Sequence, residues 1–226
     1  MDATPPQKID LRTPLSLAAA FRFPLQSRIA RAEVIKGALI LMIPVVGWIL
    51  NMGHRIEMTH RMQHGKPAWP AWVNYRQLFR DGALTLLGMI EYHAPAAFCD
   101  LCAWHFDLPW LHAAAALLWI AATIAVPGYM SHYCYARDPS EIFNPLKAMR
   151  RVFQVGAGYW HAWLVALAAL ALSFAGLLAF GIGFLATSVW FWQVAGFSFA
   201  TQFTQAFGLE AERDHGIDAG SAPPGD

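Results

Sequence analysis

The sequence predicts an all-α, polytopic integral membrane protein with four full transmembrane helices and one broken hydrophobic segment. The strongest observation is a run of 58 residues between Arg151 and Glu210 that contains no Asp, Glu, Lys or Arg. A single helix of that length would measure roughly 87 Å, against a hydrocarbon core of about 30 Å, so the run must fold back. Composition agrees, because apolar residues make up 57% of the chain and charged residues only 14%.

Four segments are long and apolar enough to be predicted as full spans. The 58-residue run supplies two of them, residues 159–180 and 184–203, with a turn at Gly181-Ile182-Gly183. The uncharged run 108–136 supplies a third, which we expect to end near Pro127. Residues 82–99 supply the fourth, although Glu91 and His93 make it less apolar.

The first hydrophobic segment, residues 37–54, is only 18 residues long and contains Pro44 and Gly47. Proline removes a backbone donor and glycine loosens a helix, so we expect a break at this point. Both flanks of the segment are basic, and both therefore favour the cytoplasmic side. The segment is either a re-entrant hairpin, which returns both flanks to one side, or a short fifth span.

Basic residues predict the orientation. Residues 1–36 contain six Lys or Arg, residues 52–80 contain five and residues 132–157 contain four, whereas residues 82–136 contain none. The positive-inside rule places the three basic regions in the cytoplasm, and the C-terminus with them. The expected location is the inner (plasma) membrane.

The predicted organisation is a single membrane domain between two polar ends. Residues 1–36 form a cytoplasmic arm, in which residues 11–23 are read as an amphipathic helix on the membrane surface. The alternative for these residues is a solvated arm that packs on nothing. Residues 37–209 form the membrane domain, and residues 210–226 are predicted to be a disordered acidic tail.

The loop after the first segment has a characteristic pattern of glycine, proline, tryptophan and aspartate. It resembles the domain of unknown function 4013 family of bacterial and archaeal integral membrane proteins, and the resemblance covers roughly residues 30–210. The family implies several membrane helices and no agreed activity. Independently, the prolines predict an interfacial elbow with its tryptophans at the headgroup level. The matching residues are Gly53, Gly65, Pro70, Trp72, Asp81 and Gly82.

Glu57, His60 and His64 fall on one face of a predicted helix, within about 60° of one another. Carboxylate and imidazole together suit zinc, iron or manganese. Arg61 lies on the same face, however, and a positive charge disfavours a cation there. The alternative is a solvated polar face at the membrane surface.

Cys99, Cys102 and His105 follow one another at three-residue spacing near the predicted outer turn. Thiolates and imidazole at this spacing suit a soft metal. Two alternatives stay open. The cysteines form a strained disulfide if the turn faces an oxidising compartment, or they are inert thiols in an apolar interior.

Glu91 is predicted to lie about 13.5 Å into its helix, near the bilayer centre, with His93 two residues on. A carboxylate there is unfavourable by several kcal/mol unless it is protonated or paired. We therefore expect Glu91 to be protonated and to face other helices. Its role is either an ion or proton path, or a structural hydrogen bond.

The sequence contains no glycine-rich phosphate loop, nucleophile elbow or paired catalytic carboxylates. The predicted function is therefore that of a non-enzymatic scaffold or accessory subunit of a membrane assembly. The alternatives are a small transporter or channel-like protein that uses Glu91, and a metal-dependent membrane enzyme. No cofactor is predicted. The expected partners are the lipid bilayer and a second copy or another membrane protein, and the net charge of +1 does not indicate nucleic acid.

The charge pattern makes a prediction about topology. Single cysteines at positions 5, 66 and 220 should all escape labelling by a membrane-impermeant thiol reagent applied from outside the cell, because all three positions lie in or beside regions assigned to the cytoplasm. Labelling at position 5 alone would show that residues 37–54 cross the membrane as an ordinary span.

Overall fold

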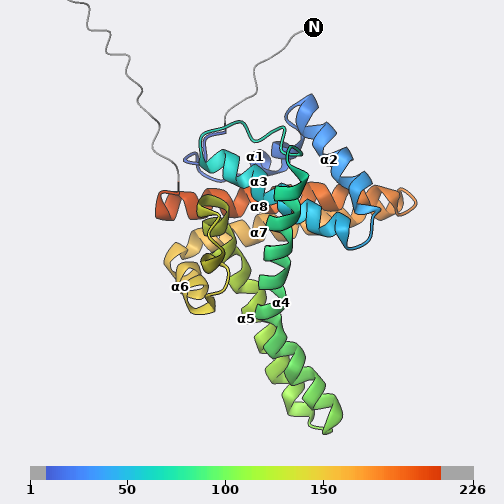
Figure 1. Ribbon diagram of the computed structural model, residues 1–226, viewed down its shortest axis with the longest axis vertical. Helices are drawn as coiled ribbons and strands as arrows, with labels where there is room; N and C mark the ends of the chain where they lie inside the picture. The colour runs from blue at the N-terminus through green and yellow to red at the C-terminus, as the bar shows by residue number, and fades with distance from the viewer. Residues whose placement is uncertain (1–8, 210–226) are drawn as a thin grey trace, which may run out of the picture.

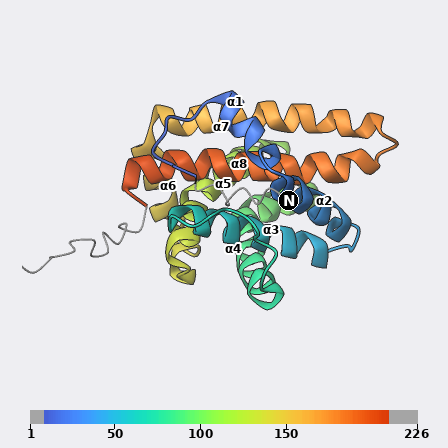
Figure 2. The same cartoon turned by 90° about the horizontal axis from the view of Figure 1, so that it is seen from above.

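The computed structural model describes residues 9–209, and within that range every regular element is a helix. Two long helical hairpins dominate the molecule and lie across one another (Figures 1 and 2). One pairs α4 with α5, and the other pairs α7 with α8. The helices are α1 Leu17–Arg22, α2 Arg28–Leu41, α3 Val46–Gln63, α4 Tyr75–His105, α5 Pro109–Ala136, α6 Pro145–Val155, α7 Ala157–Ser173 and α8 Ile182–Phe207.

Three of the helical segments in residues 9–209 are long and apolar enough to cross a membrane: Pro109–Ala136, Ala157–Leu178 and Ile182–Phe207. The predicted all-α class is confirmed, and so is the turn at Gly181, whose φ of 78° is left-handed. The predicted number of four full spans is not confirmed, because three helical segments of residues 9–209 qualify. The fourth candidate lies within α4, which is long but carries Glu91 and Asp100 among its apolar residues.

The predicted break in the first hydrophobic segment is confirmed. α2 ends at Leu41 and α3 begins at Val46, so Pro44 lies in the turn between them. Asn51 donates a hydrogen bond to the Gly37 carbonyl at 3.2 Å, which shows that the second helix folds back against the first. Residues 37–54 therefore form a helical hairpin, and a single continuous helix over this segment is excluded.

α5 does not end near Pro127, as the sequence led us to expect, but continues to Ala136. Proline removes one backbone donor, yet the turns that follow are held by packing. Tyr129 and Tyr133 beyond it are fully buried, and Gly128 lies against the backbone of α6 at Ala148. Tertiary contacts on this face outweigh the local cost of the proline.

The N-terminal arm packs on the body of the protein, so the reading of an arm that packs on nothing is wrong. Leu11 and Leu15 are buried, and the Phe23 ring stacks on Phe197 of α8 with centroids 4.5 Å apart. The helix also begins later than predicted, at Leu17, because the Ser16 hydroxyl caps it. α2 runs continuously through the predicted boundary between residues 36 and 37. The predicted tail, residues 210–226, lies outside the described residues.

Helices α3 and α4 cross at their closest approach through two glycines. A Cβ atom on Gly53 would lie 1.8 Å from the Leu78 carbonyl oxygen, and one on Gly82 would lie 1.9 Å from the Ile49 carbonyl oxygen. Each helix therefore seats a backbone carbonyl in the space that a side chain would fill on the other. Both glycines belong to the family-like pattern, and this crossing gives a physical reason for them.

Gly53→Ala and Gly82→Ala should each destabilise the protein by about 2–3 kcal/mol, because the added methyl group forces the two backbones apart. The measurement is the thermal unfolding midpoint of the purified protein in detergent. Gly65→Asn is the control, since Gly65 faces open space at a φ of 63° that asparagine tolerates. Equal midpoints for all three variants would contradict the close crossing.

Candidate functional site

Glu33 is the centre of a buried polar cluster that ties α2 to the loop after α3. Its carboxylate oxygen Oε2 accepts a hydrogen bond from His54 Nε2 at 2.8 Å and another from the Ala71 backbone N–H at 3.0 Å. Its backbone carbonyl accepts from the Trp72 indole at 3.2 Å, and the His54 ring stacks on Trp72. The cluster holds the Pro-x-Trp part of the pattern in place.

Two opposing effects act on the pKa of Glu33. Burial raises it, but the hydrogen bond and charge of His54 and the backbone N–H groups of residues 71 and 72 lower it more. The resulting pKa lies below the ordinary value of 4.5, so the carboxylate is charged at neutral pH.

The elbow tryptophans are buried inside the protein and are not exposed on its surface. Trp69 and Trp72 are each only 5% exposed, and Ala68 and Ala71 beside them are fully buried. Trp69 packs on Phe23 of the N-terminal arm. The prolines do interrupt the helix, but they direct the loop into the protein interior, where the aromatic rings find apolar partners.

Asp81 of α4 joins this helix to the end of α5. Its Oδ1 accepts hydrogen bonds from Gln77 at 2.8 Å and from the Tyr133 hydroxyl at 3.0 Å. Arg137, at the end of α5, lies 3.8 Å from its Oδ2. Asp81 is 1% exposed, so the aspartate of the family-like pattern is an internal tie and does not face a substrate.

Glu57, His60 and His64 share a face of α3, but the structure gives them other partners. Glu57 forms ion pairs with Arg137 and Arg61. His60 Nδ1 donates to the Cys134 carbonyl at 2.7 Å, and His64 Nδ1 donates to the His60 carbonyl at 2.8 Å. Across residues 9–209 no three His, Cys, Asp or Glu side chains come together as a metal site. The two arginines explain why Glu57 is not free to bind a cation.

The outer turn brings Asp100, not the cysteines, into a polar cluster. Cys99 and Cys102 are free thiols, so of the two alternatives to a metal site the disulfide is not formed. His105 makes a ring contact with Phe106. Asp100 accepts hydrogen bonds from His112 Nδ1 and from the Trp119 indole, each at 3.0 Å, and these link α4 to α5.

Glu91 is exposed, so the expectation that it faces other helices of the chain is wrong. The next residue, Tyr92, takes the buried position and donates a hydrogen bond to the Ile142 carbonyl at 2.9 Å. Successive helical residues point about 100° apart, which turns Glu91 away from the neighbouring helices. His93 points inward, with Nδ1 2.7 Å from the Met89 carbonyl and its ring against Trp119.

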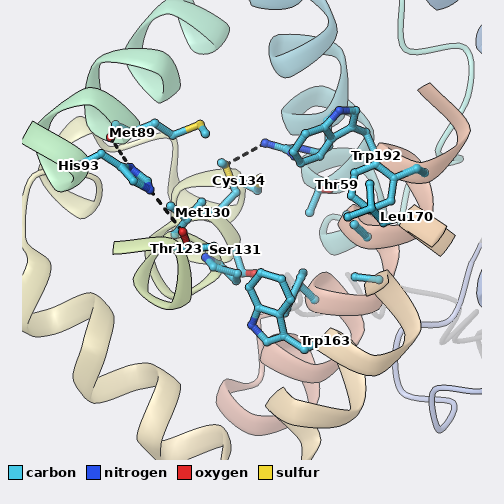
Figure 3. Close-up of a pocket in the computed structure, with 18 residues that line it drawn as sticks. Thr59, Met89, His93, Thr123, Met130, Ser131, Cys134, Trp163, Leu170 and Trp192 are labelled. Atoms are coloured by element: carbon cyan, nitrogen blue, oxygen red, sulfur yellow. Dashed lines mark hydrogen bonds between the residues drawn. The ribbon is translucent and has the colours of Figure 1, made fainter. Parts of the chain in front are cut away.

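Two adjoining cavities lie where the hairpins meet, and sequence reasoning missed both. One, of about 360 Å³, lies between α5 and the α7–α8 hairpin. Figure 3 shows Met89 and His93 on one side of it and Trp192 and Leu170 on the other. The second, of about 530 Å³, extends between the α2–α3 turn and α8. Both are mostly apolar, and they share five lining residues: Arg55, Met89, Leu170, Phe191 and Trp192.

Arg55 is the charged side chain that the two cavities share. Its guanidinium carbon lies 4.9 Å from the centre of the Trp192 ring, and one nitrogen lies 4.0 Å from the Met130 sulfur. Among the described ion pairs no carboxylate reaches it, and its buried Nε has no hydrogen-bond partner. The sequence does contain a sign that Arg55 lacks an acidic partner, because no acidic residue lies three or four positions away on its helix.

Comparison with known proteins adds no identity. No family model, no curated protein and no solved structure matches this chain. The resemblance to the domain of unknown function 4013 family stays a prediction, and the function rests on the geometry described above.

Glu33→Gln should lower stability by about 2 kcal/mol at pH 7, because the amide cannot reproduce the charge-assisted bond to His54. The stabilisation comes from a carboxylate with a lowered pKa. It should therefore be present above pH 4.5 and be lost as the pH falls below that value. Thermal unfolding of both proteins at pH 7 and pH 4 measures it. Glu91→Gln is the control, since Glu91 is exposed; a Glu33→Gln protein as stable as this control at pH 7 would refute the role.

Proposed function

We propose that this chain is a non-enzymatic accessory or scaffold subunit of an assembly in the inner membrane, with its C-terminus in the cytoplasm. The proposal rests on the far part of the α4–α5 hairpin, which we call the arm and define as residues 90–120. The arm extends away from the other helices (Figure 1). Within the arm, α4 and α5 pack on each other, and no other helix lies beside most of this part of the hairpin (Figure 1).

The single observation that carries the proposal is the position of Glu91 on the arm. Glu91 is exposed and makes no hydrogen bond or ion pair with another described residue. It lies 14 residues before the end of α4 at His105, or about 21 Å from the tip. An unpaired carboxylate at that depth is unfavourable against lipid. A donor from a second protein would satisfy it.

The surroundings of Glu91 suit a helix-packing surface. Leu87, Ile90 and Phe98 are exposed apolar residues of the same helix, and Ala94 beside them is small. Small residues next to a polar group allow close approach and an interhelical hydrogen bond within a membrane. The clustered polar groups elsewhere, by contrast, are occupied in holding the fold together.

The alternative of a transporter that uses Glu91 has less support, because Glu91 lines neither of the two cavities. The alternative of a metal-dependent enzyme has less support too. Its candidate ligand Glu57 is held by two arginines.

A photoreactive amino acid at Phe98 or Leu117 should yield protein adducts in the native membrane, because these arm positions contact the partner. Leu164 on α7 is the control, and it should yield lipid adducts alone. The three positions are 66%, 69% and 67% exposed, so reactivity is matched. Mass spectrometry of the adducts identifies the partner, and an adduct between two copies identifies a homo-oligomer.

Glu91→Lys tests whether the acid is part of the contact. The reversed charge should reduce the adduct at Phe98 about tenfold without lowering the amount of protein in the membrane. Lipid adducts alone at all three positions would overturn the proposed function, and an unchanged adduct in Glu91→Lys would remove Glu91 from the contact.

A further inference from the structure

The larger cavity contains a second polar side chain without a partner. Gln193 of α8 lines it and is 1% exposed, yet neither its Nε2 nor its Oε1 has a hydrogen-bond partner. A buried amide without partners costs roughly 1–3 kcal/mol. Arg55 adds a cation whose buried Nε also has no hydrogen-bond partner, although one of its other nitrogens contacts the Met130 sulfur.

The rest of the cavity wall is mostly apolar, and its other polar residues are Asn51, His54, Ser173 and Ser188. Leu41 and Trp48 come from the helices on either side of the break in the first hydrophobic segment, and Phe184 and Leu185 come from the start of α8. Trp48 is 63% exposed, so the break end of the cavity borders the outer surface of the protein. A ligand would therefore find its polar contacts at Arg55 and Gln193, with an apolar path leading to the surface.

We propose that this cavity binds a single-chain amphiphile with an anionic oxyacid headgroup, held by Arg55 and Gln193, and with its alkyl chain along the wall toward Trp48. A planar guanidinium offers two parallel N–H donors that match a carboxylate or a phosphate. The Gln193 amide adds a third donor from the opposite helix. The volume of about 530 Å³ lies within the range of small-molecule sites and suits one chain.

Charge complementarity excludes two other kinds of occupant. A cationic amphiphile would place like charges together beside Arg55. A wholly apolar molecule would fill the wall but leave the donors of Arg55 and Gln193 unpaired. An anionic headgroup satisfies both side chains. The cost of desolvating it is offset by its attraction to Arg55, which is strong in a site of low dielectric constant. The proposal does not depend on the arm of residues 90–120 or on the proposed scaffold function.

The test uses the full-length protein, purified in a non-ionic detergent and depleted of lipid. Binding of radiolabelled palmitate and of a labelled lysophosphatidate is measured by scintillation proximity, with hexadecanol as the uncharged competitor. We expect saturable binding of at least one of the two acids and no competition by hexadecanol. The acid that binds more tightly identifies the headgroup as carboxylate or phosphate.

Arg55→Met should weaken binding about tenfold or more, because it removes the charge-assisted hydrogen bonds and keeps the length of the side chain. Gln193→Leu should weaken it several-fold, by about the effect of one neutral hydrogen bond. Arg150→Met is the matched control, since Arg150 is an exposed cation on α6, and its binding should equal that of the original protein.

Thermal unfolding separates a binding role from a structural one. Without ligand, Arg55→Met should be as stable as the original protein or more so, because a buried charge without an acidic partner is removed. The proposal would be overturned if Arg55→Met and Gln193→Leu both bound the acid as tightly as the original protein does. Full competition by hexadecanol would overturn it too. If Arg55→Met fails to fold, Gln193→Leu and the hexadecanol competition still decide it.

Discussion

The crossing of α3 and α4 is the constraint on which the other features depend. At Gly53 and Gly82 each helix lies against the carbonyl oxygen of the other, so the two axes have a fixed separation and direction. The three residues that begin at Gly53 then point in three directions, about 100° apart. Gly53 faces α4, His54 faces Glu33 and Arg55 faces the cavities. One close contact thus positions the buried hydrogen bond between His54 and Glu33, and with it Arg55.

Three acids in the described part of the chain serve to hold its segments together. Asp81 accepts from Tyr133 of α5, Glu57 pairs with Arg137 at the end of α5, and Glu33 binds the loop after α3. Each acid reaches a segment distant in sequence, and such contacts stabilise a particular arrangement of helices because a shifted arrangement would leave a charge buried and unpaired. Arg55 differs from these acids, because it is partly buried and no carboxylate pairs with it among the described ion pairs.

The sequence was sufficient for the hairpin at Gly181 and for the break near Pro44, because both depend on local chemistry: an apolar run too long for one span, and a proline beside a glycine. It failed for Pro127, where packing of Tyr129 and Tyr133 carries the helix onward. It did not reveal the burial of Trp69 and Trp72, for the same kind of reason. The direction in which a loop turns depends on partners that are remote in sequence, such as Phe23.

The candidate site was predictable only in part. Periodicity correctly placed Glu57, His60 and His64 on one face, but it carries no information about Arg137, which lies 80 residues after Glu57. Each cavity is lined by residues of five helices spread along the chain, and no local pattern marks them. The weak local sign was the absence of an acid three or four positions from Arg55, where a helical ion pair would form. The lack of an acidic partner on the same helix does not by itself indicate a ligand site. It does so for Arg55 because the structure places this cation beside a mostly apolar cavity.

The crosswise arrangement of the two hairpins limits how the protein sits in a bilayer. Because α7–α8 and α4–α5 lie across one another, they cannot both follow the membrane normal (Figures 1 and 2). Both helices of the α7–α8 hairpin are uncharged and long enough to span, whereas α4 carries Glu91 and Asp100 beside the apolar α5. If the uncharged pair spans the hydrocarbon core, the arm is the part that tilts. A tilted arm would bring Glu91 nearer to the headgroups or to a partner, which would lower the cost of an exposed acid. Asp100 is already held by His112 and Trp119.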